Sequence, residues 1–193
     1  MNMFLEHFTQ DGKTQGWIEV VCGSMFSGKT EELLRRIKRA RFANQKILLV
    51  KPSIDIRYSD KNVVSHQGTS QDAILVNSAE EILDVWKNEK IVAIDEAQFF
   101  DDSILAVCNK LSKSGVRVIV AGLDMDYLGN PFGPIPNLLA IAEYVTKVHA
   151  ICVSCGNLAQ FSHRIINNDE QVVLGAVEEY EPLCRACFNK IQH

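Results

Sequence analysis

The fold is decided by a stretch of eight residues, Gly23-Ser24-Met25-Phe26-Ser27-Gly28-Lys29-Thr30. This stretch fits the pattern G-x-x-x-x-G-K-[ST], in which glycines let backbone N–H groups turn inward around phosphate oxygens. In such a loop Lys29 reaches the β and γ phosphates of a nucleotide, and the Thr30 hydroxyl ligates Mg²⁺. We therefore expect all eight residues to form a nucleotide site, with Thr30 as a magnesium ligand.

The flanks of this loop predict the rest of the core. Trp17 to Cys22 has the composition of a short buried strand, and Thr30 to Ala43 has the apolar spacing of a helix. The same patterns predict strands at Lys46 to Val50, Ile91 to Asp95, Val116 to Gly122 and Tyr144 to Ala150, and helices at Ala79 to Lys87 and Asp102 to Ser114. Strands rich in Val and Ile without polar alternation are buried on both faces, so the sequence predicts an α/β fold. We expect a RecA-like parallel sheet flanked by helices.

Two carboxylates end the predicted strand Ile91-Val92-Ala93-Ile94-Asp95-Glu96. Asp95 would hold the magnesium shell, and Glu96 would orient or deprotonate a nucleophile. Ala97 and Gln98, which follow, are assigned to the same nucleotide site. Many strands end in Asp-Glu as solvated turn residues, but beside a phosphate loop the pair favours hydrolysis or transfer of a γ-phosphoryl group. Lys29 and Glu96 are therefore the predicted catalytic residues.

Four of the 6 cysteines form two pairs, Cys152-x-x-Cys155 and Cys184-x-x-Cys187. Four thiolates are sufficient for a closed, structural, tetrahedral zinc site. Two disulfides are the alternative, which a reducing compartment disfavours. The composition changes near Ala150, where helical periodicity ends, so we expect a P-loop domain over residues 1–150 and a small zinc-binding domain over residues 151–193. Cys22 and Cys108 lie in apolar settings and are interpreted as buried thiols without chemistry.

The composition of the 193 residues excludes several classes of protein. With 47% hydrophobic and 23% charged residues the chain has the usage of an ordinary globular protein, and no apolar run reaches the roughly 20 residues of a membrane span. The N-terminus carries no export signal, so we expect a cytoplasmic protein. A net charge of -4 favours neither a nucleic-acid nor a membrane partner. The basic cluster is interpreted as a solvated helix face: Arg35, Arg36, Lys38, Arg39 and Arg41.

Four blocks of sequence resemble one family, the type II thymidine kinases, the zinc-containing group that includes the human cytosolic enzyme. They are Met25 to Thr30, Asp95-Glu96-Ala97-Gln98-Phe99-Phe100, Gly122-Leu123-Asp124 continuing to Asn130-Pro131-Phe132, and Glu178-x-Tyr180-x-Pro182-x-Cys184-Arg185-x-Cys187-Phe188. The blocks occur in the family's order and span nearly the whole chain. The resemblance implies ATP-dependent phosphorylation of the thymidine 5'-hydroxyl to give dTMP and ADP, a salvage step in nucleotide supply for DNA synthesis.

The resemblance also implies roles for individual residues. Glu96 would be the base for the 5'-hydroxyl, and the four cysteines would hold zinc at the foot of a lasso loop that closes over the nucleoside. The implied nucleoside site consists of Met25, Asp55, Arg57, Leu123, Tyr127, Phe132, Val172, Val173, Leu174, Gly175 and Tyr180. Tyr127 is a departure, because some members of the family have Phe there. The family further implies a homotetramer that is inhibited by dTTP.

Two other classes of protein would share these motifs. A P-loop ATPase could use a zinc domain to grip DNA, but the net charge is negative and the predicted zinc domain has more acidic than basic residues. A non-catalytic nucleotide-binding regulator would leave Glu96 without a role. Parallel assays of DNA binding and thymidine phosphorylation separate the three.

Overall fold

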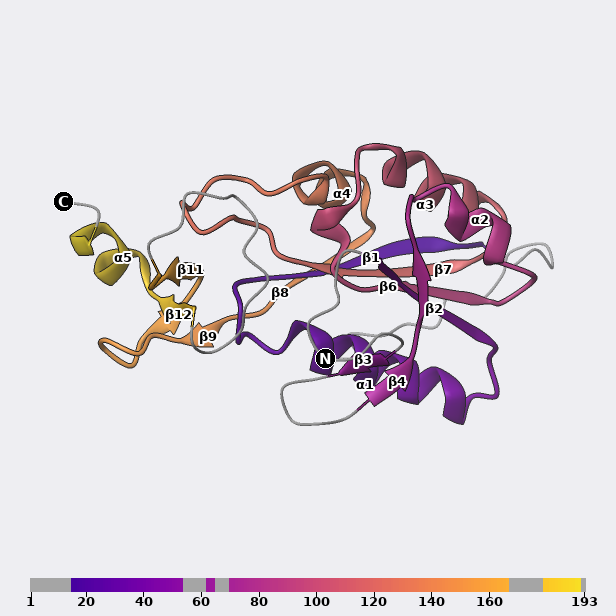
Figure 1. Cartoon of the computed structure of the whole chain (residues 1–193). Helices are drawn as coiled ribbons and strands as arrows, with labels where there is room; N and C mark the ends of the chain where they lie inside the picture. The colour runs from indigo at the N-terminus through magenta and orange to yellow at the C-terminus, as the bar shows by residue number, and fades with distance from the viewer. Residues whose placement is uncertain (1–14, 54–61, 65–69, 167–178, 192–193) are drawn as a thin grey trace.

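A parallel sheet of six strands forms the centre of the molecule (Figure 1). The computed structural model describes residues 15–53, 62–64, 70–166 and 179–191. In sheet order the strands are β5 (Ile74–Val76), β2 (Ile47–Pro52), β6 (Ile91–Ile94), β7 (Arg117–Gly122), β1 (Trp17–Cys22) and β8 (Tyr144–Lys147). All five strand pairings in this sheet are parallel. The carboxyl ends of β1, β7 and β6 therefore lie next to one another.

Helices cover both faces of the sheet (Figure 1). α1 (Lys29–Phe42) packs on one face, and α2 (Glu81–Val85), α3 (Ser103–Lys113) and α4 (Ile135–Ile141) contribute to the core on the other. Strand β1 shows why two cores form: Val20 and Cys22 point into the core with α3, and Val21 points into the core with α1. Because both faces are covered, the residues of the four central strands, β2, β6, β7 and β1, are buried or half-buried.

The C-terminal part of the chain is built from short hairpins and one helix, at the left of Figure 1. Strand β9 (Ala150–Ile151) pairs antiparallel with β10 (Leu158–Ala159), and β11 (Phe161–Arg164) pairs antiparallel with β12 (Tyr180–Leu183). Helix α5 (Arg185–Ile191) follows Cys184 directly. These elements share a small core of their own, in which the rings of Phe161 and Phe188 are stacked with centroids 4.3 Å apart. Two further short strands, β3 (Asn62–Val64) and β4 (Ser70–Asp72), form a hairpin.

The predicted α/β fold with a parallel sheet is confirmed. All five predicted strands and three predicted helices are present, with β8 ending at Lys147 and α2 confined to Glu81–Val85. Strand β5 and helices α4 and α5 were not expected, and the last of these corrects the expectation that helix is absent after Ala150. The division into domains at residue 150 stays a prediction.

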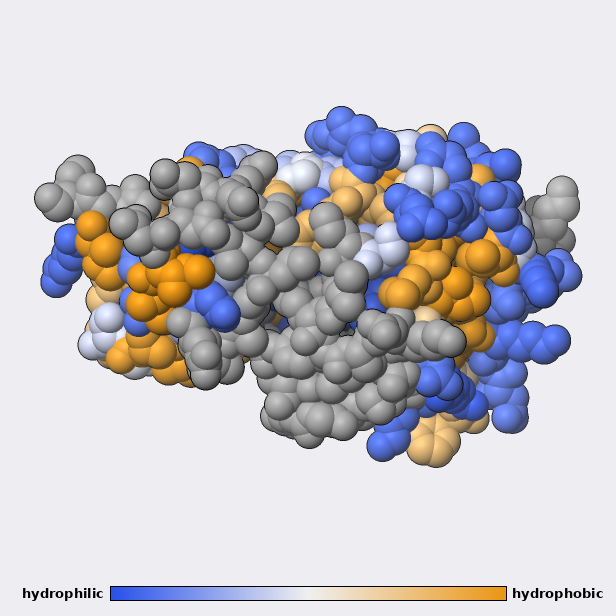
Figure 2. Space-filling model, in the orientation of Figure 1, coloured by the Kyte–Doolittle hydropathy of each residue, from blue (hydrophilic) through white to orange (hydrophobic). Residues whose placement is uncertain are grey.

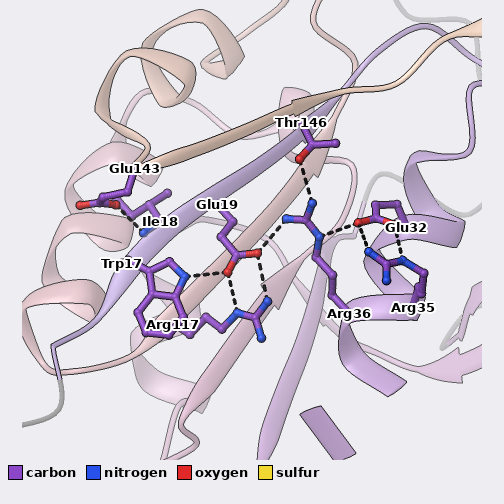
Figure 3. Close-up of polar contacts among 9 residues, drawn as sticks. All are labelled: Trp17, Ile18, Glu19, Glu32, Arg35, Arg36, Arg117, Glu143 and Thr146. Carbon is purple, nitrogen blue, oxygen red and sulfur yellow. Dashed lines mark hydrogen bonds and ion pairs between the residues drawn. The ribbon is translucent and has the colours of Figure 1, made fainter. Parts of the chain in front are cut away.

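A buried network of charges joins β1, β7, β8 and α1 (Figure 3). Glu19 on β1 is 3% exposed and accepts hydrogen bonds from Arg36 at 2.7 Å and from Arg117 at 2.6 Å. The Trp17 indole donates to the same carboxylate, and Arg36 also donates to Thr146 on β8. Burial alone would raise the pKa of Glu19, but the hydrogen bonds and charges of Arg117, Trp17 and Arg36 hold this pKa below its usual value.

This network corrects part of the interpretation of the basic cluster. Arg35, Lys38, Arg39 and Arg41 are exposed, as a solvated face requires. Arg36, however, is 3% exposed and pairs with Glu19 and with Glu32. The reason is that Arg36 lies on the same side of α1 as the buried residues Leu33 and Ile37, and a buried guanidinium is stable only when it is paired with a carboxylate.

Among the described residues, no helix has the length and apolar content to cross a membrane.

Candidate active site

The loop between β1 and α1 has the backbone that a phosphate site requires. Gly23, Phe26 and Gly28 have φ angles of 150°, 61° and 87°, so the chain repeatedly visits conformations with positive φ. A Cβ atom at position 23 would lie 2.2 Å from the carbonyl oxygen of Val148, so only glycine fits there. Helix α1 begins at Lys29, so the N–H groups of its first turn lie at the end of the loop. The loop and helix N-terminus are therefore arranged to receive an anion.

The reactive side chains of the loop already have partners in the protein. The Lys29 ammonium donates to the Ser24 carbonyl oxygen at 2.8 Å, and the Ser27 hydroxyl donates to the same oxygen at 2.7 Å. The Thr30 hydroxyl lies 3.4 Å from an oxygen of Asp95. Thr30 and Asp95, 65 residues apart in sequence, thus meet at the ends of α1 and β6. A hydroxyl beside a carboxylate is the donor set that a magnesium ion takes beside a nucleotide phosphate.

Asp95 and Glu96 lie where β6 ends. Asp95 is 4% exposed, and its carboxylate accepts a hydrogen bond from the Glu96 N–H at 3.0 Å. Glu96 has a φ of 52°, which turns the chain sharply into a 3-10 turn, Ala97–Phe99. This turn buries Ala97 in the main core and leaves Glu96 partly exposed. The two carboxylates therefore have different partners: Asp95 lies beside Thr30, and Glu96 accepts a hydrogen bond from Gln98.

A cluster of aromatic and apolar side chains, the candidate pocket for a base, is linked to Glu96 by the Gln98 side chain, which hydrogen-bonds to Glu96 and to the Leu123 backbone. Met25, Leu123, Phe132 and Tyr180 form a buried cluster, with Tyr127 packed against it. Phe26 and Phe99 pack against the same cluster, and the rings of Phe99 and Phe132 meet edge to face with centroids 6.0 Å apart. Five of the expected nucleoside-site residues are thus brought together from three separate parts of the chain. An apolar, aromatic environment of this kind suits a flat heterocyclic base.

Two residues of this site were not expected from the sequence. Arg164 is 6% exposed, and its guanidinium lies 3.7 Å from the centroid of the Tyr127 ring and donates to the Tyr180 hydroxyl at 2.8 Å. The Ser162 hydroxyl accepts a hydrogen bond from the Met25 N–H at 2.9 Å. Alternation along β11 places Ser162 and Arg164 on one face of the strand, and this spacing was the only signal in the sequence. Ser162 therefore connects β11 to the phosphate loop, and Arg164 connects β11 to the aromatic cluster.

Some expected site residues lie outside the described part of the chain. These are Asp55, Arg57, Val172, Val173, Leu174 and Gly175. Gln98 is described, and its side chain is hydrogen-bonded to Glu96 and to the backbone of Leu123. Gln98 thus contacts the pocket side of the site.

The four paired cysteines converge on one point. Their Sγ atoms all lie within 4.8 Å of one another, and those of Cys155 and Cys184 are 3.6 Å apart. Four sulfurs at about 2.3 Å from one zinc ion are about 3.8 Å from each other, so this cluster fits a tetrahedral metal. All six cysteines are free thiols, and the alternative of two disulfides is wrong. The cluster can therefore hold a metal ion, as the cysteine spacing predicted.

The two remaining cysteines take no part in a site. Both are buried, and burial raises the pKa of the Cys22 thiol to about 11 and that of Cys108 to about 12. A thiol with so high a pKa is a poor nucleophile at neutral pH.

A phosphate loop, a carboxylate pair at the end of a nearby strand and an aromatic pocket beside the second carboxylate define the class of P-loop phosphotransferases. Comparison with known proteins narrows this class. The sequence profile of the thymidine kinase family matches residues 16–188. The chain is similar to the thymidine kinase of Bacteroides thetaiotaomicron, at 57% identity over 97% of this chain and 94% of that protein. It is also 51% identical to the thymidine kinase of Porphyromonas gingivalis, over 98% of this chain and 93% of that protein.

The chain therefore belongs to the thymidine kinase family, and the family predicted from its motifs is confirmed. It is an enzyme of the kinase class.

Proposed function

We propose that this chain transfers the γ-phosphoryl group of ATP to the 5'-hydroxyl of thymidine, giving dTMP and ADP. One observation carries the proposal: the phosphate loop, where Thr30 and Asp95 lie 3.4 Å apart, also contributes Met25 to the aromatic cluster. Gln98 links the same cluster to Glu96. A nucleoside in the pocket and ATP on the loop would therefore present acceptor and donor to each other. Family membership supports the same pair of substrates.

Each residue of the site would have a separate role in the reaction. Lys29 would exchange its hydrogen bond with the Ser24 carbonyl oxygen for the β and γ phosphates of ATP, where its charge stabilises the transferring group. Glu96 would accept the proton of the 5'-hydroxyl as the oxygen attacks phosphorus. Met25, Leu123, Phe132, Tyr127 and Tyr180 would hold the base. Because phosphoryl transfer needs little covalent chemistry from the protein, positioning and charge account for most of the catalysis.

Two metals would complete the enzyme. Thr30 and Asp95 would hold Mg²⁺, which neutralises charge on the phosphates of ATP. Cys152, Cys155, Cys184 and Cys187 would hold structural zinc, and their mutual distances support this assignment. No residue of the cluster is needed for the chemical step, because four thiolates leave no open position on the metal.

A panel of nucleosides with ATP and Mg²⁺, read by the mass of the products, tests the function. If backbone groups of residues 172–175 read the base, thymidine should be used first and deoxyuridine modestly less, because a methyl group in an apolar pocket is worth roughly 1 to 3 kcal/mol. Deoxycytidine reverses the hydrogen-bonding pattern at two positions and should be discriminated against by about 10⁴-fold. Efficient phosphorylation of deoxycytidine or deoxyadenosine would contradict the assignment of thymidine.

Assembly, feedback and location are part of the same proposal. The family implies a homotetramer, and the exposed side chains of Ile151, Val153 and Leu158 supply apolar surface of the kind that oligomers cover. Apolar atoms gather over the C-terminal elements at the left of Figure 2. Light scattering that finds only monomer would contradict the tetramer. Inhibition by dTTP in the nucleoside assay and recovery of activity in the cytoplasmic fraction test the remaining two points.

A further inference from the structure

The side chain of Gln98 connects Glu96 to the backbone of the pocket. Its amide nitrogen donates to a carboxylate oxygen of Glu96 at 2.5 Å, and its amide oxygen accepts a hydrogen bond from the Leu123 N–H at 3.0 Å. Gln98 is only 3% exposed. A single buried side chain therefore contacts both the carboxylate that faces the pocket and the first residue after β7.

The orientation of this amide is determined by its two partners. The Leu123 N–H can only donate, so the oxygen of the Gln98 amide must face it. The NH₂ group then has to point at Glu96, where it meets an acceptor. A hydrogen bond to a carboxylate is stronger than one between neutral groups. Gln98 thus holds the Glu96 carboxylate in one place.

The surrounding backbone leaves room for this side chain and little else. A Cβ atom on Gly122 would lie 2.9 Å from the amide oxygen of Gln98. A Cβ atom on Gly133 would lie 2.4 Å from the Gln98 backbone oxygen. Two glycines, one just before Leu123 and one just after Phe132, therefore allow the turn that carries Gln98 to pack against the base of the pocket. The backbone at Gly122 and the backbone at Gly133 thus both restrict where the Gln98 turn can lie.

We propose that Gln98 is a positioning residue that fixes the Glu96 carboxylate against the nucleoside pocket and holds Leu123 in the pocket wall. This inference rests on the proposed function, in which Glu96 is the base. It moves Gln98 from the nucleotide site, where the motif had placed it, to the acceptor side of the reaction. Gln98 acts through Glu96 and Leu123, so its loss should affect the nucleoside half of the reaction.

Two variants separate the parts of this role. Gln98→Met keeps the length of the side chain but removes both hydrogen bonds. Gln98→Glu can still accept from the Leu123 N–H but places a second carboxylate next to Glu96. In both variants the Glu96 carboxylate loses the hydrogen bond that holds it, and in Gln98→Glu the like charge also repels it. The loss of kcat should therefore be larger in Gln98→Glu than in Gln98→Met.

The kinetic constants give a second readout. We expect kcat at pH 7 to fall about 10-fold or more in Gln98→Met, since hydrogen bonds to charged groups contribute roughly 1.5–3 kcal/mol. KM for thymidine should rise, while KM for ATP should stay within about twofold, because the two hydrogen-bond partners of this amide, Glu96 and Leu123, lie outside the phosphate loop. Gln45→Met, at an exposed position, is the matched control and should leave every constant unchanged.

A structural measurement that needs no substrate keeps the test independent of the proposed function. Crystal structures of the wild-type protein and of Gln98→Met show whether the Glu96 carboxylate and the Leu123 backbone keep their positions. A displaced Glu96 carboxylate in the variant supports the inference. A Glu96 carboxylate in the same place in both proteins, or an unchanged kcat in Gln98→Met, would overturn it. Absence of thymidine phosphorylation by the wild-type protein would instead overturn the proposed function.

Discussion

Lys29 shows how the resting site is arranged at the scale of one residue. Its ammonium group is 2.8 Å from the Ser24 carbonyl oxygen, so the loop is closed on itself by a hydrogen bond that nucleotide binding must replace. The exchange costs little, because a phosphate oxygen is a stronger acceptor than a carbonyl. The lysine would contribute a charge to the transition state, and its side chain is only partly buried in the fold.

Replacing this lysine should therefore separate catalysis from stability. In Lys29→Ala we expect kcat/KM to fall by about 10³-fold or more, because a clamp on the transferring phosphoryl group is lost. The midpoint of thermal unfolding should change by only a few degrees. Turnover and circular dichroism measured on the same sample check both expectations. Turnover near that of the wild type would remove the phosphate-loop assignment.

The sequence was most informative where a residue's role depends on its near neighbours. Lys29, Thr30, Asp95 and the four cysteines could be named from local spacing, since loop and ligand geometry are set within a few residues. Gln98 could be named from its motif, but its contact with Leu123, 25 residues away, could not. Arg164 was missed for the same reason, since Tyr127 lies in another part of the chain.

At the scale of the elements, Glu19 shows how one side chain holds a strand to its neighbours. Its carboxylate joins β1 to Arg117 on β7 and to Arg36 on α1. Without it both arginines would lose an ion pair, and the buried Arg36 would keep its pair with Glu32. We expect Glu19→Gln to lower the free energy of unfolding by about 3–5 kcal/mol. Arg35→Ala, which removes an exposed ion pair at the edge of the same network, should cost less than about 1 kcal/mol. Chemical denaturation of the two variants compares them directly.

The same carboxylate makes part of the stability depend on pH. The folded-state pKa of Glu19 is lowered, so the stabilisation is present at neutral pH and is lost as pH falls below about 4, through the folded-state pKa. In Glu19→Gln this part of the acid sensitivity should be absent, and the unfolding free energy should fall less steeply between pH 5 and pH 3. Equal slopes for variant and wild type would show that Glu19 does not titrate on unfolding.

The elements also show why some parts of the fold were not predicted. Strand β5 has three residues, too few for a periodic pattern, and pairing with β2 alone makes it a strand. Helix α4 has seven residues and begins directly after Pro134, where the sequence reads as a turn. The central strands were predicted because burial on both faces leaves a continuous apolar run, which is visible without knowledge of the partners.

At the scale of the whole molecule the cysteine cluster carries the C-terminal elements. Cys152 and Cys155 follow β9, and Cys184 and Cys187 enclose the start of α5, so one metal would join two segments separated by 28 residues. The purified protein should contain about one zinc per chain. Cys155→Ser should raise KM for thymidine more than KM for ATP, because Tyr180 and Arg164 lie in these elements and the phosphate loop does not.

Elemental analysis and steady-state kinetics check this expectation. Cys108→Ser, at a buried position outside the cluster, is the control for loss of a thiol and should retain the metal. Protein prepared without chelator that contains no metal would contradict the zinc assignment. Equal effects of Cys155→Ser on the two KM values would contradict the placement of the nucleoside against the C-terminal elements.

The hydrogen bond from the Met25 N–H to the Ser162 hydroxyl gives the phosphate loop and the C-terminal elements one shared boundary, and Phe26 packs across it. Coupling between two binding sites is reciprocal. If bound metal increases the affinity for the nucleotide by some factor, bound nucleotide increases the affinity for the metal by the same factor. Protein saturated with ATP should then lose zinc to a chelator more slowly than nucleotide-free protein does. The supply of substrate would thus affect how much of the enzyme retains its zinc.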